Sequence, residues 1–250
     1  MLPGETRSRR LGANGEFFGL RLAVPSDPPR RINWKASARA GRLLANDYAL
    51  ERTGDAVLLL DARATELGPE IDERLLSIAR AATQGIAEAL LRSKARVGVG
   101  IFGEFLEPVP LAMGTTHRLR IRAALAAARL SLQPGPPERC AIAMRRYFPP
   151  GVTVVLVSSL AGDTSGSLVP YLRYRGFPLL VLSPSPVPFL RTAVPLDPED
   201  DRLADRLITL DRRAQLARAW NDAPVVDWSE FASLGAFVEF VRRPAHRRVR

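Results

Sequence analysis

Asp55-Ala56-Val57-Leu58-Leu59-Leu60-Asp61 is a continuous apolar run that ends in an acid. A run of this length is typical of a strand buried on both faces, as in a parallel sheet covered by helices. Residues 69–92, which follow it, carry apolar residues every three or four positions, the pattern of an amphipathic helix. The segment 151–159 is a second buried strand of the same kind. These three segments together predict an α/β fold.

The rest of the sequence continues the alternation of strand and helix patterns. We expect a doubly wound, mostly parallel six-stranded sheet with helices on both faces. The strands are expected at 55–61, 95–102, 105–110, 151–159, 177–182 and 224–228, and the helices at 69–92, 115–132, 137–147, 168–175, 201–220 and 229–242. The proline-dense segment 183–198 is expected to be a loop. With the strand order 3-2-1-4-5-6, a ligand site would lie between the first and fourth strands, beyond their carboxyl ends.

One principal domain is expected, at 55–243. Residues 1–15 are expected to be a flexible basic terminus, and residues 244–250 a basic tail. The segment 16–54 is irregular in pattern and too short for a separate stable domain. We therefore expect it to pack on the domain and to wrap one edge of the sheet.

The net charge of +10 is concentrated at the two ends of the chain. Residues 1–45 carry +6 and residues 242–250 carry +5, so the part between them is nearly neutral. Basic ends attract nucleic acid, anionic lipid or an acidic protein surface by charge alone. Nucleic-acid binding and peripheral membrane association through the ends therefore stay open.

Cys140 is the single cysteine, which excludes an internal disulfide and fits a reducing compartment. It lies on the apolar face of an expected helix, so we expect a buried structural thiol. No stretch of about 18 apolar residues predicts a transmembrane helix. The expected location is the cytoplasm, for the protein itself or for the cytosolic portion of a membrane-anchored one.

Gly98-Val99-Gly100-Ile101-Phe102-Gly103 matches the dinucleotide-binding pattern G-x-G-x-x-G letter for letter. That fingerprint requires its glycines to open a helix after a strand, whereas these lie within an expected strand. We therefore expect no dinucleotide, and we interpret the small residues as positions where a helix packs closely on the strand.

Two segments ahead of the first buried strand carry a family resemblance. They are Glu16-Phe17-Phe18-Gly19-Leu20-Arg21 and Asp27-Pro28-Pro29-Arg30-Arg31-Ile32-Asn33-Trp34-Lys35-Ala36-Ser37-Ala38-Arg39. With a strand that ends in Asp61, they resemble the domain of unknown function 58 family from about Glu16 onward. The positions that carry this motif are Asp27, Arg31, Trp34, Lys35, Ser37 and Arg39.

This resemblance implies a von Willebrand factor A-like fold and a role in protein interaction. It also implies a protein partner, either a MoxR-type AAA+ ATPase or a protein that such an ATPase assembles. Family members usually carry membrane helices before this region. Trp34 is expected to pack beside the sheet core, although an aromatic ring among basic residues could instead stack on a base.

The resemblance also implies a candidate metal site. Von Willebrand factor A domains commonly hold Mg²⁺ through an Asp-x-Ser-x-Ser loop, a Thr on a second loop and an Asp after the fourth strand. Asp61 and Thr65 match the first and last positions of that loop, and Thr115 or Thr116 would supply the second-loop hydroxyl. These hydroxyls and the single carboxylate are the candidates for metal ligands.

Two positions depart from the metal-binding pattern. Arg63 stands at the first Ser, and Ser159 stands where the Asp is expected. A fixed guanidinium repels a metal ion, and Mg²⁺ requires oxygen ligands. We therefore expect no cofactor, with Mg²⁺ binding as the less favoured alternative.

Arg63 is expected to take the place of the metal. It would pair with Asp61 and present its planar fork to a carboxylate of a partner at the rim of the site. The alternative is that Arg63 folds onto Asp61 or into solvent. The candidates for partner binding are accordingly Asp61, Arg63, Thr65, Thr115 and Ser159.

Three function hypotheses follow. The first is a non-enzymatic protein-interaction module with a degenerate metal site. The second is a nucleic-acid-binding protein that uses its basic ends. The third is a hydrolase at the Ser158-Ser159 loop with His117 as the base, although no G-x-S-x-G turn supports it.

Overall fold

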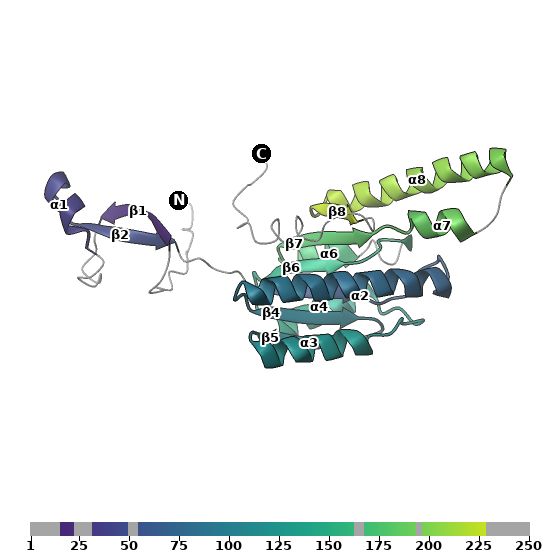
Figure 1. The fold of residues 1–250 in the computed structure, drawn as a ribbon, viewed down its shortest axis with the longest axis horizontal. Helices are drawn as coiled ribbons and strands as arrows, with labels where there is room; N and C mark the ends of the chain where they lie inside the picture. The colour runs from purple at the N-terminus through teal and green to yellow at the C-terminus, as the bar shows by residue number, and fades with distance from the viewer. Residues whose placement is uncertain (1–15, 23–31, 50–54, 163–167, 194–196, 229–250) are drawn as a thin grey trace. The chain divides into compact units, whose positions relative to one another are not determined.

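The computed structural model describes residues 16–22, 32–49, 55–162, 168–193 and 197–228 (Figure 1). The chain divides into two compact units, Met1–Arg52 and Thr53–Arg250, and each is described by itself. The expectations for residues 1–15, Asp27, Arg31, helix 229–242 and tail 244–250 lie outside the described residues. The packing of residues 16–54 on the sheet edge stays a prediction.

The smaller unit contains an antiparallel pair of strands, β1 (Glu16–Leu22) and β2 (Leu44–Ala49), and the helix α1 (Trp34–Ala40). Asn33 caps the helix, because its side chain accepts a hydrogen bond from the amide of Ala36 at 3.0 Å. The sequence pattern of this segment looked irregular because two short strands give little periodicity.

The residues of the family motif lie on and before α1. Ser37 is buried, and its hydroxyl donates to the Asn33 carbonyl at 2.8 Å. Lys35 and Arg39 are exposed. Trp34 is exposed. Its expected packing beside the sheet core stays a prediction, like the packing of the whole segment.

The larger unit is built on a six-stranded sheet of order β5-β4-β3-β6-β7-β8. Every neighbouring pair is parallel except β4 and β5, which are antiparallel. This is the expected order 3-2-1-4-5-6, and the α/β fold is confirmed. The strands are β3 (Ala56–Asp61), β4 (Val97–Phe102), β5 (Leu106–Ala112), β6 (Thr153–Val157), β7 (Leu179–Pro184) and β8 (Val225–Trp228).

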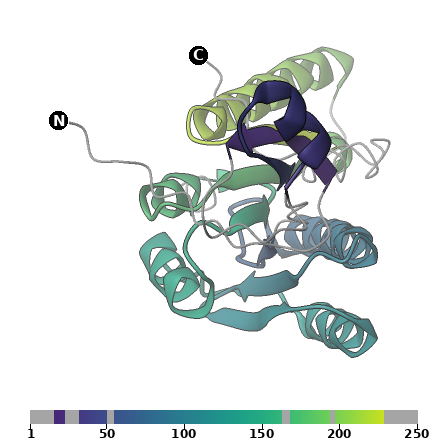
Figure 2. The same ribbon diagram turned by 90° about the vertical axis from the view of Figure 1, so that its left-hand side faces the viewer.

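Helices cover both faces of this sheet (Figure 2). Leu58 and Leu60 of β3 belong to one core cluster, which includes residues of α2 (Pro69–Arg92) and α3 (Thr115–Ala127). Val57 and Leu59 belong to the other, with residues of α4 (Pro137–Tyr147), α6 (Leu168–Tyr174) and the end of α8 (Pro198–Trp220). The burial of β3 on both faces is therefore confirmed.

Two segments differ from the sequence expectation. The helix α3 ends at Ala127, five residues early, because Ala128 is extended and the chain returns toward β3. The segment 183–198 contains a helix, α7 (Val187–Ala193), where a loop was expected. Its first turn begins at Pro186, whose carbonyl accepts from the Leu190 amide at 3.1 Å. Prolines fit the first turn of a helix, so they do not exclude one there.

Among the described residues, no helix combines the length and the apolar character needed to cross a bilayer.

Gly98 of β4 allows the end of α4 to approach the sheet, as the sequence suggested. A Cβ on Gly98 would lie 2.8 Å from the ring of Phe148, which is buried directly after α4. A Cβ on Gly100 would instead crowd Leu106 of β5 at 3.0 Å and Leu59 of β3 at 3.1 Å. The dinucleotide pattern is thus a packing feature.

We predict that Gly98→Val lowers the free energy of unfolding by about 1–3 kcal/mol, because the new side chain overpacks the contact with Phe148. Chemical denaturation measures this change. The control is Ala126→Val on the exposed face of α3, which should cost no more than about 0.5 kcal/mol. Equal losses in the two variants would contradict the close-packing interpretation.

Candidate functional site

The candidate site lies at the carboxyl ends of β3 and β6, which are neighbours in the sheet. The chain order reverses between these two strands, so their loops diverge and leave room at this edge. The first loop follows Asp61 and the second begins at Ser158. A small depression there is lined by both loops and by the start of α2.

Asp61 and Arg63 form a buried ion pair in this depression. Arg63 Nε donates to Asp61 Oδ1 at 2.8 Å, and Nη2 donates to Oδ2 at 3.0 Å. The Asp61 side chain is 3% exposed, and the Arg63 side chain is 0% exposed. The guanidinium also lies 5.1 Å from the ring centroid of Phe102, on β4. A bidentate hydrogen-bonded contact of this kind fixes the orientation of both side chains.

Ser158 completes the surroundings of the carboxylate. Its hydroxyl donates to Asp61 Oδ2 at 2.8 Å and accepts from the Leu160 amide at 3.3 Å. Burial opposes the charge on Arg63, but the carboxylate of Asp61 outweighs this effect and raises the pKa of the guanidinium. Burial also raises the pKa of the nearby Cys140 thiol, and the charge of Asp61 adds to that shift. The expected buried thiol is confirmed.

Thr65 is held by Asp72 in the first turn of α2. The Thr65 hydroxyl donates to Asp72 Oδ1 at 2.6 Å, and the Thr65 amide donates to Oδ2 at 2.7 Å. The same hydroxyl accepts from the Leu67 amide at 3.1 Å. An acid in the first turn also suits the positive end of the helix dipole. The loop after β3 is therefore tied to α2 through a buried carboxylate.

The loop after α3 returns to this site, and Thr115 does not. Ser131 donates its amide to the Ala62 carbonyl and accepts from the Ala64 amide, each at 2.8 Å.

Thr115 follows β5, whose end pairs with Val97 at the beginning of β4. It thus lies at the opposite edge of the sheet, and the expectation that Thr115 or Thr116 joins Asp61 is wrong. A three-residue turn between β4 and β5 makes that pair antiparallel, which reverses the direction of the chain.

Ser159 lines the depression together with Asp61. Its carbonyl accepts from Arg212 Nη1 at 2.6 Å and from the Ser183 hydroxyl at 3.0 Å. Arg212 is 4% exposed, and its Nη2 also donates to Asp227 Oδ1 at 2.6 Å. The loop after β6 is therefore fastened to α8 and β8.

The Ser158–His117 pair proposed for a hydrolase is not formed. His117 Nε2 donates to the Val97 carbonyl at 2.7 Å, at the amino end of β4. Ser158 lies at the carboxyl end of β6 and donates to Asp61. The two residues therefore occupy opposite edges of the sheet, and His117 cannot activate the Ser158 hydroxyl.

Arg63 does pair with Asp61, but its expected place on the rim is wrong. The side chain is buried, and its fork faces the Asp61 carboxylate. Phe102 and the loop at Ser131 enclose it. Arg63 can therefore fix the shape and charge of the site, and it cannot reach a partner carboxylate without leaving Asp61.

Sequence reasoning missed three residues of the site, which are Asp72, Arg212 and Ser131. The helical pattern around the first two could have identified them. Asp72 falls on the same helix face as the buried residues Leu75 and Ala79, where an acid is unusual. Arg212 likewise shares a face of α8 with buried Ala219. Ser131 carried no signal, because only the unexpected end of α3 brings it to Arg63.

The donor set at this edge is poor in metal ligands. Both oxygens of Asp61 accept hydrogen bonds from a cation, and both oxygens of Asp72 accept from Thr65. In the described part of the chain, no group of three or more His, Cys, Asp or Glu side chains is placed to hold a metal ion. The site therefore offers a neutralised, hydrogen-bonded carboxylate.

Comparison with solved structures gives distant similarities. The chain is 14% identical to the conserved hypothetical protein BatB from Bacteroides thetaiotaomicron, with a TM-score of 0.46 over 75% of this chain and 97% of that one. An aerotolerance-related membrane protein from Bacteroides fragilis is also 14% identical, with a TM-score of 0.40 over 75% and 96%. The mussel byssus proximal thread matrix protein 1, with a zinc-occupied MIDAS motif, is 12% identical, with a TM-score of 0.43 over 76% and 44%.

All of these TM-scores are below 0.5, so the fold assignment depends on the strand order of this chain. No curated protein sequence matches the chain significantly.

The family comparison covers more than half of the chain. The family described as "Protein of unknown function DUF58" matches residues 20–159. The matched part contains the motif before α1, the strand β3 and the Asp61 loop, and it ends at Ser159. The chain belongs to the DUF58 family.

Proposed function

We propose that the protein is a non-enzymatic interaction module that binds another protein at the carboxyl edge of its sheet. In this proposal the Arg63 guanidinium replaces the metal ion of a von Willebrand factor A-type site. The buried pair of Asp61 and Arg63 is the observation that carries the proposal. Because the Arg63 guanidinium is part of the protein itself, the carboxyl edge of the sheet keeps this arrangement without a bound metal ion.

The residues around Asp61 are poorly suited to holding a metal ion, and this supports the proposal that the metal site is degenerate. An Mg²⁺ ion on Asp61 would lie beside the Arg63 guanidinium, which already contacts both carboxylate oxygens. Two positive charges that contact the same carboxylate repel each other strongly in a buried environment. Ser159 adds no carboxylate to the set. The residues present therefore do not fit a hard divalent cation, which requires several oxygen ligands.

Exposed apolar residues beside the ion pair support a protein partner. Leu132 is 72% exposed and directly follows Ser131, whose backbone pairs with Arg63. Phe105 is 59% exposed in the turn between β4 and β5. The amide of Gly135 donates to the Gly103 carbonyl at 2.9 Å, which joins the two turns. Contiguous exposed apolar patches mark protein interaction sites, and in this proposal Leu132 and Phe105 contribute to one.

Family membership supports the finer part of the proposal, a MoxR-type AAA+ ATPase or a protein assembled by one. The family resemblance implies this class of partner. The absence of an enzymatic role is part of the same proposal, and the hydrogen bond from Ser158 to Asp61 supports it. A hydroxyl that donates to a carboxylate paired with arginine has no base to activate it.

We predict that Arg63→Met lowers the free energy of unfolding by about 3–5 kcal/mol, because it leaves the Asp61 carboxylate buried and unpaired. The double variant Asp61→Asn/Arg63→Met should lose less, because it removes both charges. Chemical denaturation of the single and double variants measures the coupling.

The control for this cycle is Arg74→Met, which removes an exposed pair with Glu70 and should cost no more than about 1 kcal/mol. A loss for Arg63→Met as small as the loss for Arg74→Met would show that the buried pair does not hold the site together.

We predict that a MoxR-type AAA+ ATPase from the source organism binds the purified protein, and that Leu132→Ser weakens binding about tenfold. Leu119→Ser on α3, which is 55% exposed, is the matched control and should leave the Kd unchanged. Biolayer interferometry measures both.

A parallel titration with duplex DNA at two salt concentrations tests the alternative partner. Phosphate-driven binding weakens linearly with the logarithm of salt concentration. DNA binding that persists at physiological salt, without any complex with the ATPase, would replace this proposal with the nucleic-acid hypothesis.

A further inference from the structure

Eight basic residues gather at the edge of the sheet opposite the candidate site, where the parallel strands begin. Four segments lead there from a helix into a parallel strand, and we call them together the amino edge: 92–96, 145–152, 173–178 and 218–224. Asp222 is the only acid in these segments. Their basic residues, of which all except Arg175 are exposed, are Arg92, Lys94, Arg96, Arg145, Arg146, Arg173, Arg175 and Arg218.

Exposed aromatic rings lie beside these charges at the ends of three helices. Tyr147 at the end of α4 is 47% exposed, Tyr174 at the end of α6 is 87% exposed, and Trp220 at the end of α8 is 62% exposed. Each ring follows an arginine by one or two positions in the sequence. The Arg146 guanidinium lies 5.8 Å from the centroid of the Tyr147 ring. The combination of an exposed ring and an arginine is therefore repeated three times.

These three helix ends lie along one face of the sheet at a similar level. Residues of α4, α6 and the end of α8 belong to the same core cluster, and Figure 2, which looks onto the amino edge, shows the three helices along one side of the sheet. The strands that follow them are paired near their beginnings, since Val154 pairs with Leu179 and Val181 pairs with Val225. The rings are therefore presented together along one rim of the larger unit.

The helix dipole accounts for part of this arrangement and leaves the rings unexplained. A cation in the last turn of a helix is stabilised by the partial negative charge at that end. An exposed aromatic side chain gains nothing from the dipole. Tyr and Trp combine an apolar ring with a polar group, and they are enriched where a membrane meets water. Basic side chains beside them are attracted to the phosphates of anionic lipids.

We propose that the amino edge lies against a membrane surface that carries anionic lipids, with the three rings at the level of the headgroups and the basic side chains at the lipid phosphates. The inference goes beyond the proposed function, because the protein partner proposed above binds the opposite edge of the sheet. The carboxyl edge of a bound molecule would face away from the membrane and would stay open to that partner.

Nucleic acid is the other polyanion that a basic edge attracts, and the placement of the rings favours lipid. The axes of packed helices lie about 8–10 Å apart, whereas successive bases in a stacked strand lie about 3.4 Å apart. Rings at the ends of three different helices do not match the spacing of successive stacked bases. A membrane surface requires no such spacing, because each ring inserts among the headgroups by itself.

Co-sedimentation of the full chain with lipid vesicles tests this inference. Vesicles of phosphatidylcholine and phosphatidylserine should bind the protein, and vesicles of phosphatidylcholine alone should not. Arg173→Glu should weaken binding at least fivefold, because one basic residue near an anionic surface contributes about that factor.

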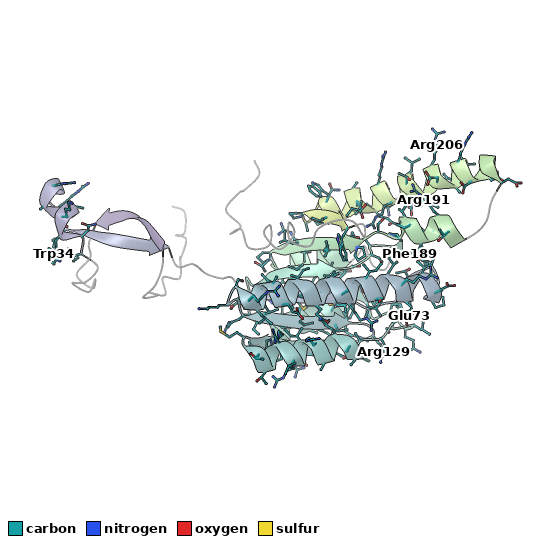
Figure 3. The ribbon with its side chains drawn as sticks, viewed as in Figure 1. Trp34, Glu73, Arg129, Phe189, Arg191 and Arg206 are labelled. Carbon is teal, nitrogen blue, oxygen red and sulfur yellow. The ribbon has the colours of Figure 1, made fainter. Side chains whose placement is uncertain are left out.

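The matched control is Arg206→Glu, which makes the same change of charge at an exposed position of α8 nearer to the carboxyl edge (Figure 3). About 21 Å of helix separates this position from Trp220, which is more than twice the screening length of about 8 Å at physiological salt. Arg206→Glu should therefore leave vesicle binding nearly unchanged.

Quenching of tryptophan fluorescence by lipids with brominated acyl chains tests the placement of the rings. Trp220 and Trp34 are equally exposed and lie in different units of the chain. Quenching by the anionic vesicles should be largely lost in Trp220→Phe and kept in Trp34→Phe.

Absence of binding to the anionic vesicles, equal effects of Arg173→Glu and Arg206→Glu, or quenching that depends on Trp34 would each overturn the inference. Binding of duplex DNA that Arg173→Glu weakens, without binding to vesicles, would assign the amino edge to nucleic acid and overturn it as well. These outcomes are separate from the proposed function, because a complex with the ATPase that depends on Leu132 forms at the opposite edge and would survive them.

Discussion

The buried ion pair between Asp61 and Arg63 is the interaction on which the carboxyl edge of the sheet depends. Burying two charges costs several kcal/mol for each ion, and only close pairing with further hydrogen bonds compensates that cost. Here the guanidinium contacts both carboxylate oxygens, Ser158 adds a hydroxyl, and Phe102 supplies an aromatic face. These contacts hold the chain after β3 in place, and the neighbouring loops are positioned from it.

Three contacts extend this constraint to the rest of the edge. Asp72 ties the loop after β3 to the first turn of α2, and Ser131 ties it to the loop after α3. Arg212 holds the loop after β6 through the Ser159 carbonyl. All of these partners are buried or backbone groups, which makes the edge a rigid surface. Preorganised surfaces lose little conformational entropy on binding, which supports the proposed role in protein interaction.

Most of the sheet could be predicted from the sequence, because β3 and β6 are apolar runs and α2 is strongly periodic. The order 3-2-1-4-5-6 gave the right edge for Asp61, Thr65 and Ser159. Thr115 was misplaced because the direction of β5 depends on a short turn. The burial of Arg63 depends on Phe102 and Ser158, and Ser158 lies 97 residues from Asp61 in the sequence. Such long-range contacts leave no periodic signal.

The most direct test of the account is a crystal structure of the protein soaked in Mn²⁺ and measured at the manganese absorption edge. The account predicts that Arg63 remains paired with both oxygens of Asp61, and that no anomalous peak lies within about 2.0–2.6 Å of that carboxylate, the range of hard-cation–oxygen bonds. An anomalous peak on Asp61, with Arg63 displaced from it, would show that the site binds a metal ion and would contradict the proposed replacement of the metal by arginine.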